Sequence, residues 1–491
     1  MPAKEWTIEI DRHRGFAPRY FEGSYPSYGN KSGQSQAGAM QNMSLLDPSV
    51  LKPGPGTAEL TNGDQGGVVT TLIKGIIRHA ISSDVAYGIG GAKLYKFSAS
   101  TVNSGGSPSW PRTIDKSVVT AESGEDVAYY QGSLYYSYGH SGSAGDMGKY
   151  DLSTTFDDDY YSASATGGAD LQDGPHQLLV GGDDILYIAN GRFIASLDGS
   201  TASPQALDFW QNSIVNSITW NYNRVIAAVN RPNITGANQN QSAIYRWNGY
   251  SSSWEGDPVE ISGRIGALYT KNGITYVWHE NFEGGTARLV FGYINGGSVV
   301  PLRTFSGSLP LYYQVGEYFD YIAWLSSGRL YLYGPVSGEM PVDMFQFMSP
   351  QYTANAGGIA SPFGTMLISS NDGSNYSLEK ESGYAVSATY KTLLHETSLD
   401  GLHSYVGKIE FQFDQLASGA RVDVSLVDNK GTTIWSETIS HTAHGTATKA
   451  VFYPAAQGEN MRLQYDHASG SASNPVNIRK VKINGKNIPL G

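Results

Sequence analysis

The residues that could support catalysis or metal binding are scattered along this chain. Its 491 residues include 10 histidines and no cysteine, which excludes thiolate metal sites, a cysteine nucleophile and a disulfide scaffold. His441 and His444 form the closest histidine pair, and the surrounding sequence offers no clear third metal ligand. The chain contains no Gly-x-Ser-x-Gly, His-Glu-x-x-His, phosphate-binding or dinucleotide-binding motif. We therefore expect a protein that is not an enzyme, with no catalytic residue, no bound metal and no cofactor.

Two further polar motifs favour structural roles. Asp157-Asp158-Asp159 has three adjacent carboxylates, whereas calcium loops alternate their ligands around a glycine turn. A solvated acidic loop is therefore the better interpretation of these aspartates. Ser369–Tyr376 resembles a degenerate Asp-box, the hairpin motif of sialidase-type propellers, with Asn371 replacing the aspartate and Tyr376 the tryptophan. Short polar side chains bond to the local backbone in such a turn, so this motif supplies no catalytic group.

The elements that carry these residues are predicted to be short strands in a repeated pattern. The tetrapeptide Asp-Val-Ala-Tyr occurs at Asp84–Tyr87 and again at Asp126–Tyr129, 42 residues later. Apolar strand pairs continue the series with a mean spacing of about 45 residues, which is typical of four-stranded propeller blades. The pairs are Leu94-Tyr95, Leu134-Tyr135, Leu186-Tyr187, Val225-Ile226, Ile274–Tyr276, Leu330-Tyr331 and Met366-Leu367. We interpret each pair as the second strand of a blade, which predicts a seven-bladed β-propeller over residues 61–385.

Composition and alternation extend the all-β prediction to the rest of the chain. Glycine accounts for 59 residues and tyrosine for 33, while charged residues make up only 16%, and no helical periodicity is found. In residues 386–491 the apolar positions alternate with polar ones over short stretches between turns. These positions include Ile409, Phe411, Phe413, Val422, Val424 and Leu426. Such a module is typical of a β-sandwich of the jelly-roll type.

Charge and hydropathy restrict the classes of partner. The formal net charge of −11 is spread along the chain, which argues against gripping nucleic acid through clustered basic residues. The first ten residues lack the apolar core of a signal peptide. No stretch of about 20 apolar residues occurs, so we expect no membrane span.

Residues 1–60 are predicted to form an extended arm, because they lack the blade pattern but carry large aromatic side chains. The arm either lies on its own propeller or reaches a neighbouring subunit. In the second case its aromatic residues would form a partner interface, since such residues supply rigid apolar area. The candidates are Trp6, Tyr20, Phe21, Tyr25 and Tyr28.

Other tyrosines divide into two groups. Four of them recur beside the apolar residue of a strand pair, so they are expected to pack between blades. These are Tyr95, Tyr135, Tyr187 and Tyr331. The cluster Leu311-Tyr312-Tyr313 stands outside the series and is a freer candidate for partner contacts.

The segment Gln41–Thr57, followed by a cysteine-free propeller and a sandwich, resembles bacteriophage tail structural proteins. The nozzle or packaged-DNA-stabilisation proteins of short-tailed phages are similar in kind, and they form a hexameric, propeller-bearing ring below the portal. The resemblance implies a virion structural protein in the phage tail, assembled as a homo-oligomeric ring such as a hexamer. Its partners would be itself and other tail or portal-adjacent proteins, and genome DNA would pass at ejection without specific binding.

Two alternatives remain open. The first is a carbohydrate-binding or glycan-cleaving propeller that acts at the host surface, with a host glycan as its partner. The second is a bacterial surface or scaffold protein.

Overall fold

The protein is described by a computed structural model. The residues that the structure describes are 5–11, 26–27, 37–41, 43–44, 47, 49–54, 56–60, 69, 71–77, 81–82, 84–105, 109–114, 122–140, 143–163, 165–231, 241–283, 286–305, 307–334, 345–348, 355–371, 376–384, 387–392, 394–395, 402–458, 460–467 and 474–489. Almost all regular structure in them is β. The helical elements are short: α1 (Ala99–Ser104), η2 (Tyr312–Gln314) and α2 (His441–His444). Within these ranges no helix has the length and apolar character needed to cross a membrane.

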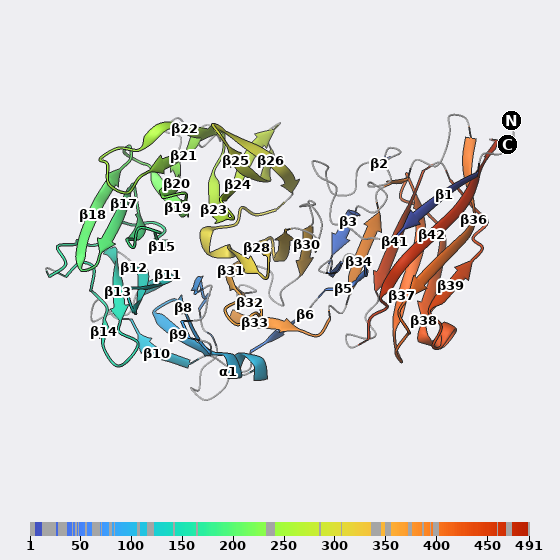
Figure 1. Ribbon diagram of the computed structural model, residues 1–491, viewed down its shortest axis with the longest axis horizontal. Helices are drawn as coiled ribbons and strands as arrows, with labels where there is room; N and C mark the ends of the chain where they lie inside the picture. Colours follow the sequence, from blue (N-terminus) through green and yellow to red (C-terminus); the bar gives the residue numbers. More distant parts are fainter. Residues whose placement is uncertain are drawn as a thin grey trace. The chain divides into compact units, whose positions relative to one another are not determined.

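Antiparallel sheets of four strands follow one another along much of the chain, as propeller-like blades do (Figure 1). The first three comprise β7 (Gly75–Ile76), β8 (Val85–Gly90), β9 (Lys93–Ser98) and β10 (Ser109–Thr113); β11 (Glu122–Tyr130), β12 (Ser133–His140), β13 (Ser143–Tyr150) and β14 (Phe156–Asp157); and β15 (Leu178–Val180), β16 (Leu186–Asn190), β17 (Phe193–Asp198) and β18 (Thr201–Asp208). The fourth and fifth comprise β19 (Ile214–Asn221), β20 (Arg224–Arg231), β21 (Gln241–Trp247) and β22 (Glu255–Ile261); and β23 (Ile265–Lys271), β24 (Ile274–Glu283), β25 (Thr286–Asn295) and β26 (Ser298–Phe305). The sixth and seventh comprise β27 (Val315–Tyr318), β28 (Tyr321–Ser326), β29 (Arg329–Tyr333) and β30 (Phe345–Met348); and β31 (Asn355–Ala360), β32 (Leu367–Asn371), β33 (Tyr376–Ser382) and β6 (Gly56–Glu59).

The first strands of these sheets surround a common middle. Each contacts the first strand of the next sheet, in the order β7, β11, β15, β19, β23, β27 and β31, and β31 contacts β7 again. Glycine permits the closest approaches in this crowded middle. A Cβ atom at Gly75 would collide with the backbone of Asp126, and one at Gly358 would collide with the backbone of Lys74.

The strand pairs noted in the sequence are not all equivalent. Leu134, Leu186, Val225, Ile274 and Leu367 lie in the second strand of a sheet, but Leu94 lies in β9 and Leu330 in β29, which are third strands. The two Asp-Val-Ala-Tyr copies also differ, because Asp84–Tyr87 runs into second strand β8 and Asp126–Tyr129 lies in first strand β11. The assumption of one equivalent position was therefore wrong. Neighbouring strands of a hairpin carry the same local pattern, so spacing alone does not distinguish them.

Packing divides the chain into two compact units. One contains Ala58–Gly328 and Pro350–Lys380, and we call it the ring unit. The other contains Met1–Thr57, Arg329–Ser349 and Glu381–Gly491, and we call it the C-terminal unit. The division predicted from the sequence, with an arm at 1–60, a propeller at 61–385 and a sandwich at 386–491, stays a prediction.

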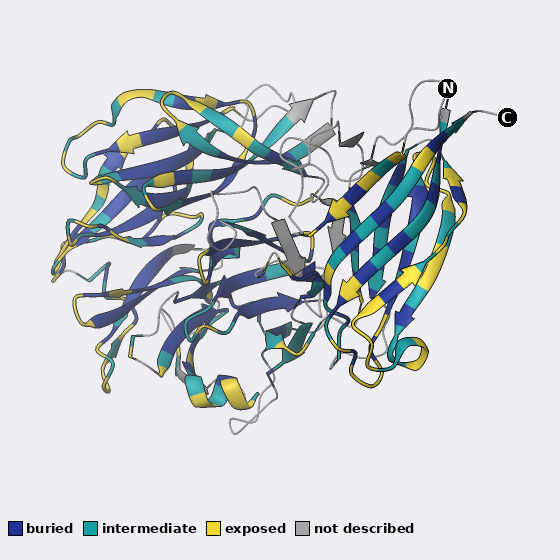
Figure 2. Cartoon of the chain, turned by 45° about the vertical axis from the view of Figure 1, so that its right-hand side comes forward, coloured by how far each residue is buried: buried dark blue, intermediate teal, exposed yellow. Residues whose placement is uncertain are grey.

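Besides β29 and β30 of the sixth sheet, the C-terminal unit contains two larger sheets and a short pair. One sheet consists of β1 (Glu5–Ile10), β42 (Ile478–Pro489), β36 (Leu402–Phe413), β39 (Lys449–Phe452) and β40 (Ala456–Gly458). The other consists of β2 (Pro26–Ser27), β35 (Leu394–His395), β41 (Met461–His467), β34 (Ala388–Thr392), β3 (Ala37–Gln41), β37 (Arg421–Asp428) and β38 (Thr433–Ser440), and β4 (Met43–Ser44) pairs with β5 (Lys52–Pro53). The alternating residues predicted from the sequence are buried: Ile409, Phe411, Phe413, Val422, Val424 and Leu426. Figure 2 shows this alternation along the long strands, and the rings of Phe411 and Tyr465 meet between the two sheets with their centroids 6.4 Å apart.

The N-terminal strand β1 is part of a sheet in the C-terminal unit. It pairs with β42 in antiparallel register, with Trp6 opposite Gly485. A Cβ atom at Gly485 would strike the indole ring of Trp6, so this glycine makes room for the ring. Trp6 therefore packs within its own chain. The other candidates for a partner interface, Tyr20, Phe21, Tyr25 and Tyr28, lie outside the described residues.

Candidate functional site

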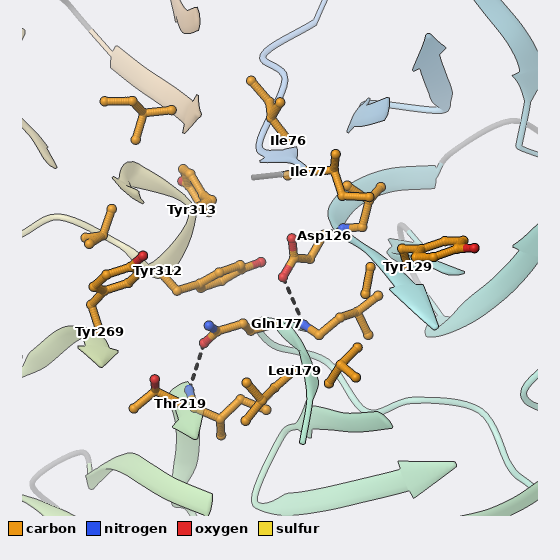
Figure 3. Close-up of a pocket in the computed structure, with 18 of the residues that line it drawn as sticks. Ile76, Ile77, Asp126, Tyr129, Gln177, Leu179, Thr219, Tyr269, Tyr312 and Tyr313 are labelled. Atoms are coloured by element: carbon orange, nitrogen blue, oxygen red, sulfur yellow. Dashed lines mark hydrogen bonds between the residues drawn. The ribbon is translucent and has the colours of Figure 1, made fainter. Parts of the chain in front are cut away.

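A cavity of about 560 Å³ lies in the middle of the ring unit, and we call it the central pocket (Figure 3). Every first strand contributes to its lining. The contributions include Ile76 of β7, Asp126 of β11, Val180 of β15, Thr219 of β19, Tyr269 of β23, Val315 of β27 and Ile359 of β31. The pocket is therefore a product of the whole ring rather than of any single sheet.

Several polar side chains around the central pocket hold neighbouring first strands together. Asp126 Oδ2 accepts the backbone N–H of Leu178 at 2.9 Å, and Gln177 Oε1 accepts that of Ile218 at 2.7 Å. Figure 3 shows both bonds as dashed lines. Ser217 Oγ, which is buried, accepts the N–H of Leu268 at 3.0 Å. Each bond joins one sheet to the next, so these groups fix the geometry of the lining.

Asp126 is committed to the backbone through both carboxylate oxygens. Its Oδ1 accepts the N–H of Val127 at 2.9 Å while Oδ2 is bonded to Leu178. A carboxylate in this position stabilises the fold, because buried backbone N–H groups need acceptors. It is poorly placed to exchange a proton with a ligand.

Four tyrosines give the central pocket its aromatic character: Tyr129, Tyr269, Tyr312 and Tyr313. Tyr129 is 45% exposed, whereas Tyr269 is buried and its hydroxyl donates to Glu317 at 2.5 Å. Tyr312 and Tyr313 project from the turn η2, and their rings meet edge to face at 5.2 Å. Gln314 holds this turn, since its Oε1 accepts the N–H of Leu311 and its Nε2 donates to Ala356 O.

Tyr312 crosses the middle of the ring to reach a carboxylate. Its hydroxyl donates to Glu125 Oε2 at 3.0 Å, and Lys74 forms an ion pair with the same carboxylate. Burial, and then the charge of Glu125, raises the pKa of Tyr312 well above its usual value. The same two causes raise the pKa of Tyr313 to about 12. Both phenols therefore remain protonated donors at neutral pH.

Four side-chain polar groups of the central pocket remain available to a ligand. They are the amide nitrogen of Gln177 and the hydroxyls of Tyr129, Thr219 and Tyr313, and no described residue bonds to any of them. The remaining lining is largely apolar and includes Ile76, Ile77, Leu179 and Val180. Aromatic and apolar walls with a few free donors suit an uncharged, hydroxyl-rich molecule.

A second hollow, of about 750 Å³, also has Tyr313 in its lining. Its charged groups are paired: Arg264 binds both carboxylate oxygens of Glu280 at 2.7 and 2.8 Å. Asn371, from the motif that resembles an Asp-box, accepts a hydrogen bond from Asn355 at 2.8 Å. Ser369 of the same motif is buried and accepts the N–H of Ile73 at 3.0 Å. The motif thus joins the seventh sheet to the segment before β7, which is a structural role.

The structure changes the interpretation of two other sequence motifs. Asp158 is buried, where it pairs with Arg112 and accepts from the hydroxyl of Tyr136, so the expected solvated loop is corrected at this residue. Tyr312 is also buried, although the sequence had marked it as free for partner contacts. Across the described ranges, no three His, Asp or Glu side chains are grouped so as to hold a metal ion.

Sequence reasoning predicted the burial of four strand tyrosines and missed the pocket. Tyr95, Tyr135, Tyr187 and Tyr331 are all buried. The pocket residues come from seven separated segments, each of which contributes only one to four side chains. Asp126–Tyr129 was noted as a repeat, but nothing in its local sequence shows that it faces the middle of a ring.

Comparisons with known proteins identify no family for this chain. No protein-family model and no curated protein matches it. Among solved structures, the computationally designed Ika8 protein has a TM-score of 0.38 at 12% identity, covering 67% of this chain and 100% of that one. An exo-β-1,3-galactanase from Phanerochaete chrysosporium has a TM-score of 0.32 at 10% identity, covering 87% of this chain and 99% of that one. Drosophila Plexin A in complex with Semaphorin 1b has a TM-score of 0.38 at 10% identity, covering 66% of this chain and 86% of that one. Similarity at this level carries no argument about activity, so the site is judged from its own residues.

Proposed function

We propose that the seven four-stranded sheets form one closed propeller, that the C-terminal unit is a β-sandwich, and that the protein binds carbohydrate in the central pocket. The observation that carries the function is the combination of tyrosine walls with unbonded donors on Gln177, Thr219 and Tyr313. Sugars present apolar ring faces together with hydroxyl groups. A pocket that offers aromatic surface and hydrogen-bond donors complements both features.

Binding without cleavage is the better account of the central pocket. Glycoside hydrolysis normally requires two carboxyl groups, one of which gives a proton to the leaving oxygen. Here both oxygens of Asp126 accept backbone N–H groups, and Glu125 is engaged by Lys74 and Tyr312. Neither carboxylate is free for that work.

The virion function inferred from the phage-tail resemblance stays a prediction. It rests on the segment Gln41–Thr57 and on the order of propeller and sandwich. Of the residues proposed for a partner interface, Trp6 packs against Gly485 of its own chain. No contact of the described residues favours the tail function over carbohydrate binding.

The proposal is tested by titrating the purified protein with oligosaccharides from cellulose, chitin and galactan in a calorimeter. We expect one of these classes to bind and the Tyr129→Ala variant to bind it about tenfold more weakly, as for loss of one aromatic contact. Tyr453→Ala is the matched control, because Tyr453 is 74% exposed and lies in the C-terminal unit. Failure of the folded protein to bind any sugar would contradict the proposal, and release of new reducing ends would show that the pocket cleaves its ligand.

A further inference from the structure

Two smaller pockets lie on either side of the hairpin that joins β19 to β20. The one towards the third sheet has about 390 Å³ and is lined by Asp183, Trp220, Asn223, Arg224, Asn248 and Tyr250. We call it the outer pocket. The one towards the fifth sheet has about 400 Å³, and Tyr222, Arg224, Gly273 and Thr275 are among its lining residues. We call it the end pocket, and Arg224 belongs to both.

The outer pocket and the central pocket are lined by nearby residues of the same two segments of chain. Val180 and Thr219 line the central pocket, and Asp183 and Trp220, which follow them closely in sequence, line the outer pocket. Between them, Gly181 and Gly182 lie directly against the indole of Trp220, where an added Cβ atom would come within 3.0 and 2.7 Å of the ring. The absence of side chains at these glycines lets the backbone pack directly against the indole of Trp220.

The outer pocket has the chemistry of a sugar subsite. Trp220 stacks on Tyr187 with ring centroids 6.1 Å apart and an interplanar angle of 19°, and Tyr250 is 75% exposed. Asn248 Oδ1 accepts the N–H groups of Tyr250 and Ser251 at 2.9 Å. This arrangement orients the side chain, and its amide nitrogen has no partner within the described ranges. A fixed aromatic floor with a free amide donor matches the apolar face and hydroxyl edge of a sugar ring.

The end pocket contains an exposed aromatic residue at the tip of a hairpin. Tyr222 and Asn223 have left-handed φ values of 44° and 60°, as the two central residues of a tight turn closed by the pair Asn221 and Arg224 require. The turn leaves the side chain of Tyr222 78% exposed. Its hydroxyl lies over Gly273 of the neighbouring hairpin, where any Cβ atom would collide with it. An exposed ring fixed in this way offers an apolar face to a ligand.

We propose that the ligand is an extended polysaccharide that occupies the central, outer and end pockets in sequence. This inference rests on the proposed function and adds the class of ligand to it. The central pocket binds one part of the chain, Trp220 and Tyr250 bind the part that leaves it, and Tyr222 supports the segment beyond. Contacts at successive subsites belong to one molecule, so affinity rises with the length of the oligosaccharide.

The test is a series from disaccharide to octasaccharide of whichever polysaccharide binds in the calorimeter. For the natural protein we expect the octasaccharide to bind about tenfold or more tightly than the shortest sugar that binds. The double variant Tyr222→Ala/Tyr250→Ala should bind the short sugar with unchanged affinity. It should no longer bind the octasaccharide more tightly than the short sugar. Both side chains are largely exposed, so we expect the fold to be retained, and circular dichroism checks this.

Phe319→Ala is the matched control, because Phe319 is 60% exposed and has a left-handed φ of 50°, yet it lines none of the three pockets. It should keep the full dependence on length. An affinity that does not change with length, or an equal loss at all lengths in the double variant, would overturn the extended ligand while leaving carbohydrate binding intact. No binding at any length would instead reject the proposed function. If the double variant changed self-association in sedimentation and not sugar affinity, the surface would be a protein interface and the proposal wrong.

Discussion

The central pocket and the outer pocket differ in what their hydrogen bonds connect. In the central pocket the side chains of Asp126 and Gln177 bond to the backbone of the next sheet. In the outer pocket Asp183 accepts from Tyr187 and Asn248 accepts from its own turn, within one sheet. The bonded groups near the middle therefore hold the ring together, whereas those of the outer pocket fix only local side chains. Loss of a bonded group should affect stability more in the first region, and loss of an aromatic group should chiefly affect binding in the second.

Replacement of Asp126 by alanine should give the largest effect. The change leaves the N–H groups of Val127 and Leu178 without their acceptor. Hydrogen bonds to a charged group contribute about 1.5–3 kcal/mol each, so the free energy of unfolding should fall by about 3 kcal/mol or more. Urea denaturation followed by tryptophan fluorescence measures this change. Asp126→Asn retains one acceptor oxygen and should lose less, whereas a loss below about 1 kcal/mol in the alanine variant would contradict a structural role.

Replacement of Trp220 by alanine should mainly affect binding. Loss of the aromatic floor should weaken binding of the octasaccharide by about 2 kcal/mol, or about thirtyfold in affinity, since aromatic anchors contribute much of the binding free energy. Titration calorimetry gives the affinity, and denaturation of the same variant gives its stability. If unfolding changed by more than binding, Trp220 would belong with the structural residues and the contrast between the two pockets would fail.

Acid should weaken the central region through His176, which immediately precedes Gln177. Burial lowers the pKa of His176 below 6.5, so the folded state holds the neutral ring where the unfolded state takes up a proton. This contribution to stability is complete above about pH 6.5 and is lost as the pH falls, at up to about 1.4 kcal/mol per pH unit. Denaturation between pH 7 and 5 measures the slope. His176→Gln should reduce the dependence of the free energy of unfolding on pH in this range. An unchanged dependence would show that other groups cause the loss of stability in acid.

The smallest effect is expected for Tyr312→Phe. The variant loses one hydrogen bond to Glu125, while Lys74 still pairs with that carboxylate. The free energy of unfolding should fall by about 1 kcal/mol, and sugar binding should change little because this hydroxyl is already occupied. A large loss of affinity with unchanged stability would move Tyr312 from the structural group to the binding group.

The sequence predicted local pattern better than spatial arrangement. Alternation at Ile409–Phe413 and Val422–Leu426 correctly indicated buried strand faces, because each strand shows its period over a few adjacent residues. The pairing of β1 with β42 joins residues near the two ends of the chain, and no period reports such a pairing. Leu94 and Leu330 were assigned to second strands but lie in third strands. Second and third strands of a sheet have the same local sequence pattern, so the sequence does not distinguish them.

The candidate site was less predictable for the same reason. Tyr129, Thr219 and Tyr269 come together only because their strands meet around one middle. A hydrogen bond such as that from Leu178 to Asp126 spans 52 residues of sequence and has no local signature. Carbohydrate binding was one of the alternatives left open by the sequence, but the residues that would bind the sugar required the three-dimensional arrangement.

The last sheet is completed by β6, a strand that precedes all the others of the ring in the chain. Beside it, the N–H of Leu60 donates to the carbonyl of Leu378 at 2.9 Å, so an early and a late segment meet there. Contacts this distant in sequence form slowly, because the loop they close is long. The central pocket is lined by residues of both β7 and β31. It is therefore complete only when the early and the late segment of the chain have come together. A sugar in the central pocket would bind only the state in which β6 completes the last sheet. It would therefore slow the separation of the two segments.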